Sequence, residues 1–331
     1  MKKILYIAAS VMLVLASCTN DESAPEQIEV GFNALTKKSS KSIITLSTFT
    51  QGSDKFNVWG FYDQAATGTT AVNLDAATAS NFMSNVTIEY VTDTWRNATN
   101  HYYWPLEGKV GFYGLYPSTY TPASVTWDGI SISDYTITSA NSSGTNADDL
   151  MYAYAESGRL TGGAALPMTF YHALSQVSFL FKTDANYPGA TINVNSVTLN
   201  DIDLSGDFSF KQPSTTGWTD NEAQTEDFIY YATQSGAITT GDAQQYGLNT
   251  LMIPQSIGAN QKATINFTIS QLNSTDITYS FEIPLTTETN DWKIKTGYVY
   301  TINFKLNEIL FNPSVDSWAS IDVSPIDLYN L

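Results

Sequence analysis

Apolar and polar residues alternate along most of the chain in short runs. A period of two places every second side chain on the same face of an extended strand. The clearest runs lie at residues 86–90, 177–181, 265–269, 277–283 and 298–306. Turn-forming sequences rich in Gly, Asp, Asn, Ser and Thr separate them. The pattern predicts an all-β protein built from antiparallel sandwiches, with one short helix at residues 76–86.

The first alternating run lies close to the N-terminus, and a polar segment follows it. The apolar members of the run are Ile28, Val30 and Phe32. The segment from 36 to 42 then carries three lysines, Lys37, Lys38 and Lys41. Its composition is typical of an accessible loop that a protease can cut, although a solvated loop with no such role would look the same.

Upstream of this strand, the sequence predicts a secretory signal. Two lysines precede a nearly unbroken apolar run of twelve residues, 4–15. That is too short to cross a bilayer, which takes about 20 residues, but suits a signal-peptide core. Small residues before Cys18, the only cysteine, are typical of a bacterial lipoprotein signal. We therefore expect a signal peptide over 1–17, lipidation at Cys18 and a tether over 18–27; the alternative is an ordinary signal peptide with a chance cysteine.

Length and local composition indicate two domains after the tether. About 310 mature residues are enough for two cores of ordinary size. Residues 156–167 are rich in Gly and small side chains, and a new run of apolar alternation begins directly after them. We therefore expect an N-terminal domain over 28–165 and a C-terminal domain over 166–331.

The chain is strongly acidic, with 32 Asp and Glu against 15 Lys and Arg. Loss of the signal peptide would remove Lys2 and Lys3 and leave 13 basic residues against 32 acidic ones, a formal net charge of −19. Such a surface repels nucleic acid and anionic lipid headgroups. Nucleic acid is therefore not an expected partner, and membrane contact would come from acyl chains.

Little in the sequence points to catalysis or metal binding. The two histidines, His101 and His172, have no GxSxG motif beside them and zinc patterns are absent, so structural roles are expected. Residues 201–207 resemble the start of a calcium loop, but Gln212 occupies the twelfth position, where a bidentate Glu is needed. A strand, bulge and hairpin explain that stretch better. The adjacent acids at 148–149 fit an acidic surface rather than a glycosidase pair, and we expect no catalytic residue, metal or cofactor.

Exposed aromatic side chains offer the main alternative function, because Trp and Tyr rings can stack on sugars. Five aromatic residues lie in loop-like or strand-end positions: Trp95, Tyr102, Tyr103, Trp104 and Trp218. Three other tryptophans are expected in the core: Trp59, Trp292 and Trp318. The alternative is a monomeric surface lipoprotein that binds glycans.

Several segments follow one another in a distinctive order: IEVGFNAL after the lipoprotein signal, FNVWGFYD at 56–63, HYYWPLEGKVGFYGLYPS at 101–118, DLMYAYAES at 149–157, LPMTFYHALSQVSFLFKT at 166–183 and ILFNPSVDSWASIDV at 309–323. Taken together, they resemble the fimbrillin-like fimbrial subunit lipoproteins of Bacteroidetes. In that family an LMYA stretch closes the first domain and an F-x-HALSQ strand opens the second. The resemblance covers most of the mature chain in the family's order.

The resemblance implies two tandem transthyretin-like antiparallel β-sandwich domains and a pilus subunit. Such subunits reach the outer membrane surface as lipoproteins, and a protease then removes the anchor with the first strand, here that of Ile28, Val30 and Phe32. A strand from a neighbour's C-terminus fills the groove. The candidate donor residues in this chain are Ile309, Phe311, Ile321, Val323, Ile326 and Leu328.

One departure from the family pattern concerns the cut. Members that an arginine-specific protease cuts carry Arg after the first strand, whereas this chain has only lysines there and its two arginines lie at Arg96 and Arg159. Either another protease acts or the chain is an uncut anchor or accessory subunit. We expect a non-enzymatic fimbrial subunit at the outer membrane and cell surface. Its expected partners are other fimbrial subunits and a host or bacterial surface ligand.

Overall fold

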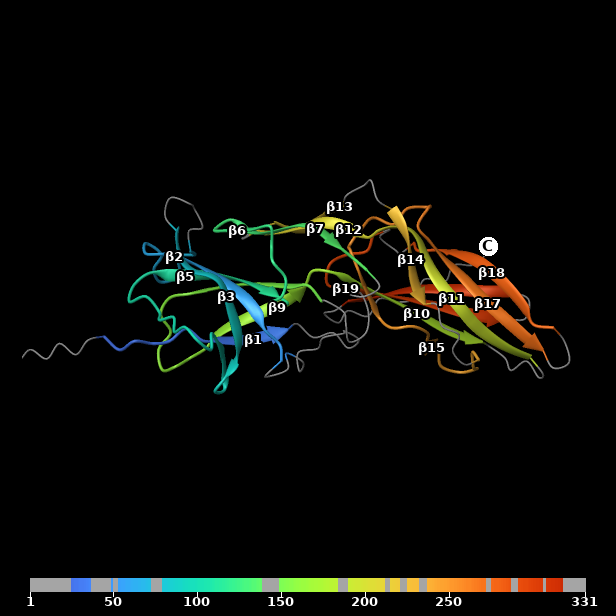
Figure 1. The fold of residues 1–331 in the computed structure, drawn as a ribbon, viewed down its shortest axis with the longest axis horizontal. Helices are drawn as coiled ribbons and strands as arrows, with labels where there is room; N and C mark the ends of the chain where they lie inside the picture. The colour runs from blue at the N-terminus through green and yellow to red at the C-terminus, as the bar shows by residue number, and fades with distance from the viewer. Residues whose placement is uncertain are drawn as a thin grey trace, which may run out of the picture.

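The computed structural model describes residues 25–36, 49, 53–72, 79–138, 149–183, 190–211, 215–220, 225–231, 237–271, 275–286, 291–305 and 308–317. Every regular element in these residues is a β-strand, which confirms the predicted all-β class. A helix long and apolar enough to cross a membrane does not occur among them. The molecule is elongated, with the N-terminal strands at one end and the C-terminal strands at the other (Figure 1).

Seven strands close into a barrel at the N-terminal end (Figure 1). In order around the ring they are β1 (Phe32–Thr36), β4 (Thr94–Arg96), β3 (Ala79–Val91), β2 (Phe56–Asp63), β5 (Lys109–Tyr116), β8 (Met151–Ser157) and β9 (Leu166–His172). The ring is closed by β1 and β9, which run parallel to each other. Closure leaves this part of the molecule without an open sheet edge.

Two sheets pack face to face at the C-terminal end and form a sandwich. One contains β15 (Gln244–Gln245), β10 (Ser175–Thr183), β19 (Thr296–Lys305) and β20 (Glu308–Ser317), with β16 (Thr250–Met252) also paired to β10. The other contains β14 (Thr225–Tyr231), β11 (Ala190–Asp203), β17 (Lys262–Gln271) and β18 (Ile277–Pro284). Rings join the two layers: Phe179 lies 4.8 Å from Tyr230, and Phe267 lies 4.9 Å from Phe304, between centroids.

A fourth sheet links the two halves of the chain. It contains β13 (Thr215–Asp220), β12 (Ser205–Lys211), β7 (Gly129–Thr136) and β6 (Ser124–Thr126). Within it β12 pairs with β7 of the N-terminal half, and β9 closes the barrel although it lies after residue 165. The domain division between residues 165 and 166 stays a prediction. Two strand pairs, β7 with β12 and β1 with β9, join residues on opposite sides of this division.

Two apolar cores lie on opposite faces of the barrel strands β2, β5 and β8. One core fills the barrel, and the other continues from the outer face of these strands into the C-terminal sheets. Consecutive residues therefore belong to different cores. Val58 and Phe112 face the barrel core, whereas Trp59 and Tyr113, the residues that follow them, face the other core. Burial on both faces explains why FNVWGFYD and KVGFYGLY are almost continuously apolar rather than alternating.

Hydrogen-bonded aromatic residues stabilise the C-terminal core. The Trp292 indole N–H donates to the Tyr300 hydroxyl at 2.9 Å, and that hydroxyl donates to the Leu285 carbonyl at 2.9 Å. Burial raises the pKa of Tyr300 above its usual value, and burial raises the pKa of Tyr298 to about 12. These hydroxyls are therefore neutral at physiological pH and have a structural role.

The alternating runs form strands, as predicted. The apolar residues of the 177–181 run in β10 are completely buried, and those of the 298–304 run in β19 are 2% exposed or less. The helix expected at 76–86 is wrong, because β3 begins at Ala79 and pairs with β2. Its inward residues Met83 and Val86 are buried in the barrel, and this tertiary pairing outweighs the local pattern.

The two tandem transthyretin-like antiparallel sandwiches are not confirmed. The N-terminal half is a closed barrel, and only the C-terminal half contains two facing sheets. Two strand pairs are parallel, β1 with β9 and β10 with β19. Period-two alternation identifies strands but carries no information about the direction of their partners.

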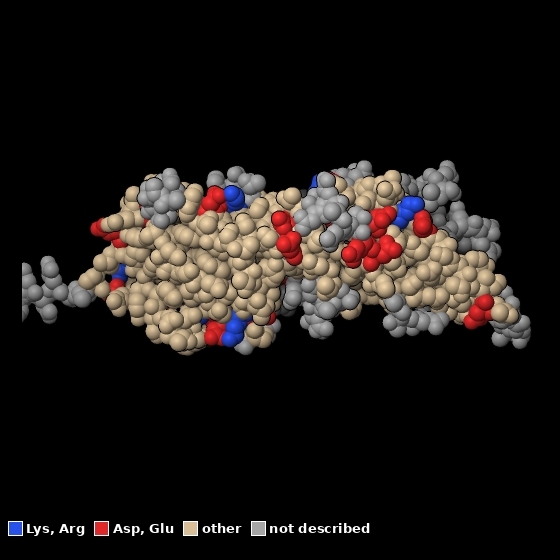
Figure 2. Space-filling view, turned by 45° about the horizontal axis from the view of Figure 1, so that its top comes forward, with Lys and Arg blue, Asp and Glu red and all other residues tan. Residues whose placement is uncertain are grey.

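Charged side chains are sparse on the described part of one face of the molecule. Figure 2 shows a face dominated by uncharged residues, with acidic and basic side chains in small separate groups. Exposed ion pairs such as Lys211–Asp128 and Lys262–Glu282 lie at 2.5 and 2.9 Å. Pairs of this kind contribute about 0–1 kcal/mol each, so the fold depends on its cores rather than on surface charges.

Candidate functional site

The strand that closes the barrel is the candidate site. On one side, residues 32–36 of β1 pair in parallel with residues 166–170 of β9, over five register pairs. Just before β1, the Leu166 N–H donates to the Gly31 carbonyl at 2.8 Å. Figure 1 shows β1 lying along β9 at the margin of the barrel. This side of β1 is held along its whole length.

The other side of β1 is held at fewer points. A single register pair, through Trp95, joins it to β4. The residues before β1 are tied to a loop: the Val30 N–H donates to the Tyr102 carbonyl at 2.7 Å, and the Trp104 N–H donates to the Ile28 carbonyl at 2.9 Å. Residues 28–36 therefore have backbone partners on both sides, with the sparser set on the β4 side.

The first strand lies in a closed ring and not at a sheet edge. A ring of seven strands has no edge, so β1 must have a neighbour on each side. The β4 side is short because β4 itself has three residues. The strand is therefore the closing member of a barrel, and its loss would open the ring between β4 and β9.

We call residues 28–36 the closing segment. Alternate residues of this segment fill the barrel interior. Ile28, Val30 and Phe32 are 9%, 3% and 1% exposed. The Phe32 ring lies 5.2 Å from that of Phe112, edge to face. Each of these side chains contributes about 1.5–3 kcal/mol through burial. In contrast, Leu35 lies on the opposite face and is 37% exposed.

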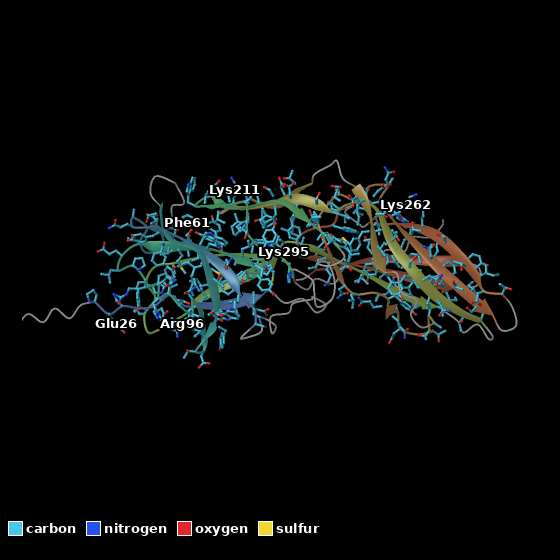
Figure 3. All side chains as sticks on the ribbon, viewed as in Figure 1. Glu26, Phe61, Arg96, Lys211, Lys262 and Lys295 are labelled. Carbon is cyan, nitrogen blue, oxygen red and sulfur yellow. The ribbon has the colours of Figure 1, made fainter. Side chains whose placement is uncertain are left out.

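A charged cluster holds the polar face of the same segment. The Glu29 carboxylate accepts from Arg96 Nη1 at 2.7 Å and from His101 Nδ1 at 2.8 Å. Since an ionised carboxylate only accepts, His101 carries its proton on Nδ1. Three residues before Glu29, the Glu26 carbonyl accepts a hydrogen bond from Arg159 Nη2. Figure 3 shows Glu26 and Arg96 at the same end of the barrel. We call Glu29, Arg96 and His101 the Glu29 clamp.

Gly31 allows the closing segment to approach β4 closely. A Cβ atom at this position would lie 3.0 Å from the Thr94 hydroxyl oxygen. That separation is tighter than most real Cβ contacts, so a larger side chain here would push the strand from its neighbour. A small residue at this position therefore favours close packing of the closing segment on β4.

The closing segment contributes to one core only. Its buried residues all belong to the barrel interior, whereas β2, β5 and β8 contribute to both cores. Its outward residues are polar or partly exposed. Removing the segment would therefore uncover the barrel interior and leave the second core intact.

The structure describes only part of the predicted site. Ile309 and Phe311 lie in β20, at register positions opposite Phe304 and Ile302 of β19. The sheet order places β20 at an end, beside β19 alone among the described strands. The remaining predicted residues lie outside the described part of the chain: Cys18, Lys37, Lys38, Lys41, Ile321, Val323, Ile326 and Leu328.

His172 occupies a structural position, as expected. Its Nδ1 lies 2.9 Å from Oδ1 of Asp149 and 2.7 Å from Oδ2, and the two side chains are 1% and 0% exposed. The prediction that Asp149 belongs to the acidic surface is wrong, because a partnered carboxylate can be buried where β8 and β9 meet. The Ala173 N–H also donates to the Leu150 carbonyl, at 2.8 Å. The pair therefore fixes the turn from β9 into β10.

Most of the aromatic residues proposed for sugar stacking are not accessible. Trp95 and Trp104 are 5% and 4% exposed and belong to the barrel core, so their predicted exposure is wrong. The Trp218 indole N–H donates to the Ala173 carbonyl at 2.6 Å, and its ring is half-buried. Only Tyr103, at 40%, is exposed among the five. By contrast, the predicted burial of Trp59 and Trp292 is confirmed, and Trp318 lies outside the described residues.

The stretch at 201–207 is a strand junction. The predicted bulge is confirmed, since the β11 register shifts between Leu199 and Ile202. The predicted hairpin is wrong, because β11 and β12 belong to different sheets. Asp207 accepts from the Asp134 N–H at 2.8 Å. Within the described part of the chain, no group of three or more His, Cys, Asp and Glu side chains is arranged to hold a metal ion.

Sequence reasoning missed the Glu29 clamp and the hydrogen bonds to the 101–104 loop. Arg96 lies 67 residues from Glu29, and His101 lies 72 residues from it. No local pattern connects residues so far apart. The only available signal was an acidic residue between two apolar residues in a strand, which is common in half-buried strands.

Comparisons with known proteins agree with this fold. A fimbrial protein from Bacteroides vulgatus is similar with a TM-score of 0.65 and 16% identity, over 88% of this chain and 100% of that one. A candidate cell adhesion protein from Bacteroides uniformis gives 0.53 and 13% identity, over 88% and 99%. One from Bacteroides ovatus gives 0.52 and 14%, over 90% and 100%. No curated protein matches at a significant level.

The fold is thus one found in Bacteroides fimbrial and adhesion proteins. The sequence profile of the fimbrillin-like family matches residues 43–318, which is most of the chain. The chain therefore belongs to the fimbrillin-like family. The resemblance seen in the sequence segments is confirmed by this match.

Proposed function

We propose that this chain is a structural subunit of a cell-surface fimbria that is exported as a lipoprotein through Cys18 and assembles by donor-strand exchange. Membership of the fimbrillin-like family supports a fimbrial or adhesive role, a position at the cell surface and assembly with other fimbrial proteins. The family is one of structural subunits, so the chain is proposed as a building element rather than an enzyme. The lipid anchor at the outer membrane would hold the precursor before assembly.

One observation carries the exchange mechanism: the closing segment at 28–36 serves the barrel core alone. It comes first in the described chain and is followed by the lysine-bearing residues 37–48. A cut there would separate it covalently from the rest of the barrel. Its loss would leave an apolar slot between β4 and β9 with unpaired backbone groups on both sides, which is a template for another strand.

The slot would be lined by the residues that now contact the closing segment. The Phe56 and Phe112 rings lie 6.4 and 5.2 Å from that of Phe32. Met168 and Phe170 of β9 belong to the same core and are fully buried. An incoming strand with apolar residues at alternate positions would cover them again, with each anchor contributing about 1.5–3 kcal/mol.

The C-terminal region supplies such strands. The sheet order puts β20, with Ile309 and Phe311, beside β19 alone among the strands that the structure describes. The residues after Ser317 contain the further apolar pairs Ile321 with Val323 and Ile326 with Leu328. We propose that a segment of this region, donated by a neighbouring subunit, replaces the closing segment. Cutting after Lys37, Lys38 or Lys41 would start the exchange.

Limited trypsin digestion tests the proposal. The purified protein is incubated with trypsin and analysed by SDS electrophoresis without boiling. We expect a ladder of SDS-resistant oligomers, with N-terminal sequencing placing the new end among the three lysines. The matched control replaces Lys37, Lys38 and Lys41 with Gln; we expect it to stay monomeric under the same digestion. Ladders that form equally from the control would contradict the cut site.

A second experiment removes the proposed donor region. A chain without Leu310–Leu331 should be cut normally but form no ladder, while hydrogen exchange of the barrel amides stays as in the full chain. Unaltered polymers from this truncation would contradict the donor assignment. The alternative, a monomeric glycan-binding lipoprotein, keeps one exposed residue among its five candidate aromatics, Tyr103. It predicts a cut protein that stays monomeric and is retarded on glycan affinity gels.

A further inference from the structure

The Glu29 clamp would lose its acid when the closing segment leaves. Arg96 stays on β4 and His101 stays on the loop, while Glu29 departs with residues 28–36. The Glu29 and Arg96 side chains are 24% and 25% exposed, so most of the ion pair is shielded from water. A guanidinium left in such a place without an anion is unfavourable.

Neighbouring acids do not replace the one that is lost. On β3, Glu89 lies opposite Arg96 in the register of the two strands. Its carboxylate is bound to Lys55 at 2.5 Å, so its charge is already balanced. The emptied slot therefore carries the positive charge of Arg96 beside two apolar positions, those of Ile28 and Val30. Complementarity calls for an incoming strand with an acid between two apolar residues.

The C-terminal sequence contains this pattern. Residues 28–31 read Ile-Glu-Val-Gly, and residues 321–324 read Ile-Asp-Val-Ser. The fourth position suits a small side chain, because Gly31 lies against Thr94. Ser320 precedes the triplet and Ser324 follows it, so a small residue reaches that position whichever way the strand runs. The triplet places an acid between two apolar residues in either strand direction.

A second triplet fits less well. Residues 326–328 read Ile-Asp-Leu, but Pro325 precedes them and Tyr329 follows. Any residue other than Gly adds a Cβ atom 3.0 Å from the Thr94 hydroxyl oxygen at this position; Ser carries one further heavy atom, whereas Pro and Tyr carry a ring. The size of the side chain at the fourth position therefore distinguishes Asp322 from Asp327, although both acids lie between apolar residues.

We propose that the segment 321–324 of a second copy of this chain occupies the slot, with Asp322 bound to Arg96 in place of Glu29. This inference rests on the proposed strand exchange and names its register. Three residues, 318–320, separate the end of β20 from Ile321, and extended they span roughly 10 Å. With β20 on its own sheet, the slot of the second molecule would therefore lie directly beyond the end of β20. The Arg96–Asp322 ion pair selects the register, and the apolar neighbours supply the burial.

Charge reversal in the full-length chain tests the pair. Ladder formation after trypsin is timed for Asp322→Lys and for its matched control, Asp327→Lys. We expect Asp322→Lys to slow the ladder about tenfold, as an ion pair turned into a like-charge contact would, and Asp327→Lys to match the wild type within twofold. Asp322→Asn, which adds no repulsion, should fall between the two.

A clamp with inverted charges provides the rescue. The double variant Glu29→Lys/Arg96→Glu keeps an opposite pair in the uncut barrel, so the closing segment stays in place. We expect it to polymerise as slowly as Asp322→Lys. Adding Asp322→Lys to this double variant should restore the wild-type rate within about twofold, because Lys at 322 then meets Glu at 96.

The outcomes separate the two proposals. Ladders from Asp322→Lys at the wild-type rate, or equal slowing by Asp327→Lys, would overturn the register while leaving strand exchange intact. A failed rescue by the triple variant would also overturn it. A cut wild-type protein that remains monomeric would overturn the exchange itself and the register with it, including the case in which a chain fills its own slot.

Discussion

Two strands of the same barrel, β1 and β2, are buried in different ways. In β2 nearly every residue is buried, because its inward residues fill the barrel and its outward residues fill the second core. In β1 and the residues before it, burial alternates, and the outward face carries Glu29 and the exposed Leu35. The backbone of both strands has partners on both sides, but β1 has one register pair with β4, whereas β2 has seven with each of its neighbours.

The difference shows which strand of a closed barrel can be exchanged. Taking out β2 would uncover two cores and disrupt the connection to the C-terminal sheets. Taking out β1 would uncover one core and leave the wall of β2, β5 and β8 supported from behind. A replaceable strand is therefore one whose outer face has no apolar neighbours, even when both of its edges are hydrogen-bonded.

Removal of the closing segment should have the largest effect. A chain that starts after residue 36 should lose about 5–9 kcal/mol of barrel stability, the sum for three buried anchors. Urea denaturation followed by hydrogen exchange would show the barrel amides exposed and the sandwich amides protected. A synthetic peptide of residues 25–36 should restore protection, and the same peptide with Phe32→Asp should not. Loss of protection throughout the molecule would mean that β1 supports both cores.

A single substitution in the segment should have the next largest effect. Phe32→Ala removes a 1% exposed ring that packs on Phe112, and it should cost about 3–5 kcal/mol in the free energy of unfolding. It should also speed ladder formation after trypsin, since the segment leaves more readily. Asn33→Ala, on the exposed face, is the control and should change stability by less than about 0.5 kcal/mol. Equal costs for the two would contradict the one-sided burial of β1.

A change in the other core should be smaller and independent of exchange. Trp292→Phe removes the indole donor to the Tyr300 hydroxyl and should cost about 1–3 kcal/mol. Protection of the sandwich amides should fall, whereas the rate of ladder formation should stay at the wild-type value. A faster ladder would show that the two cores are coupled through their shared wall.

Neutralising the clamp should have the smallest effect on stability. Glu29→Gln weakens the contact with Arg96, and a partly exposed pair of this kind contributes about 1 kcal/mol or less. The deficit should shrink as salt is raised, since screening weakens the wild-type pair. Asp128→Asn, in the exposed pair with Lys211, is the matched control and should show almost no change. Urea midpoints at low and high salt measure both.

The sequence predicted the strands better than their arrangement. Alternation located β10, β17 and β19, because their alternate apolar residues lie in a core and that pattern is local. It also located β18, although Ile277 and Tyr279 of that strand are 45% and 44% exposed. The continuous apolar runs of β2 and β5 did not reveal two cores, since a strand buried on both faces has the same composition wherever it lies. Parallel closure by β1 and β9 depends on residues more than 130 positions apart along the chain. Pairing between residues so far apart produces no pattern in the local sequence.

The candidate site was predicted in part for the same reason. The alternating residues of the first strand are local, and they were found where the structure has them. Their partners, Arg96, the 101–104 loop and β9, are set by the closed ring. Trp95 and Trp104 were assigned to the surface because they lie in loop-like or strand-end sequence, but the ring turns both into the barrel.

The wall of β2, β5 and β8 has a mechanical consequence. In the proposed fimbria, load would pass from barrel to sandwich through side chains packed on both faces of the same strands. The pairing of β7 with β12 adds backbone bonds to that path. Stretching one molecule would therefore have to shear a whole sheet before its two ends could separate.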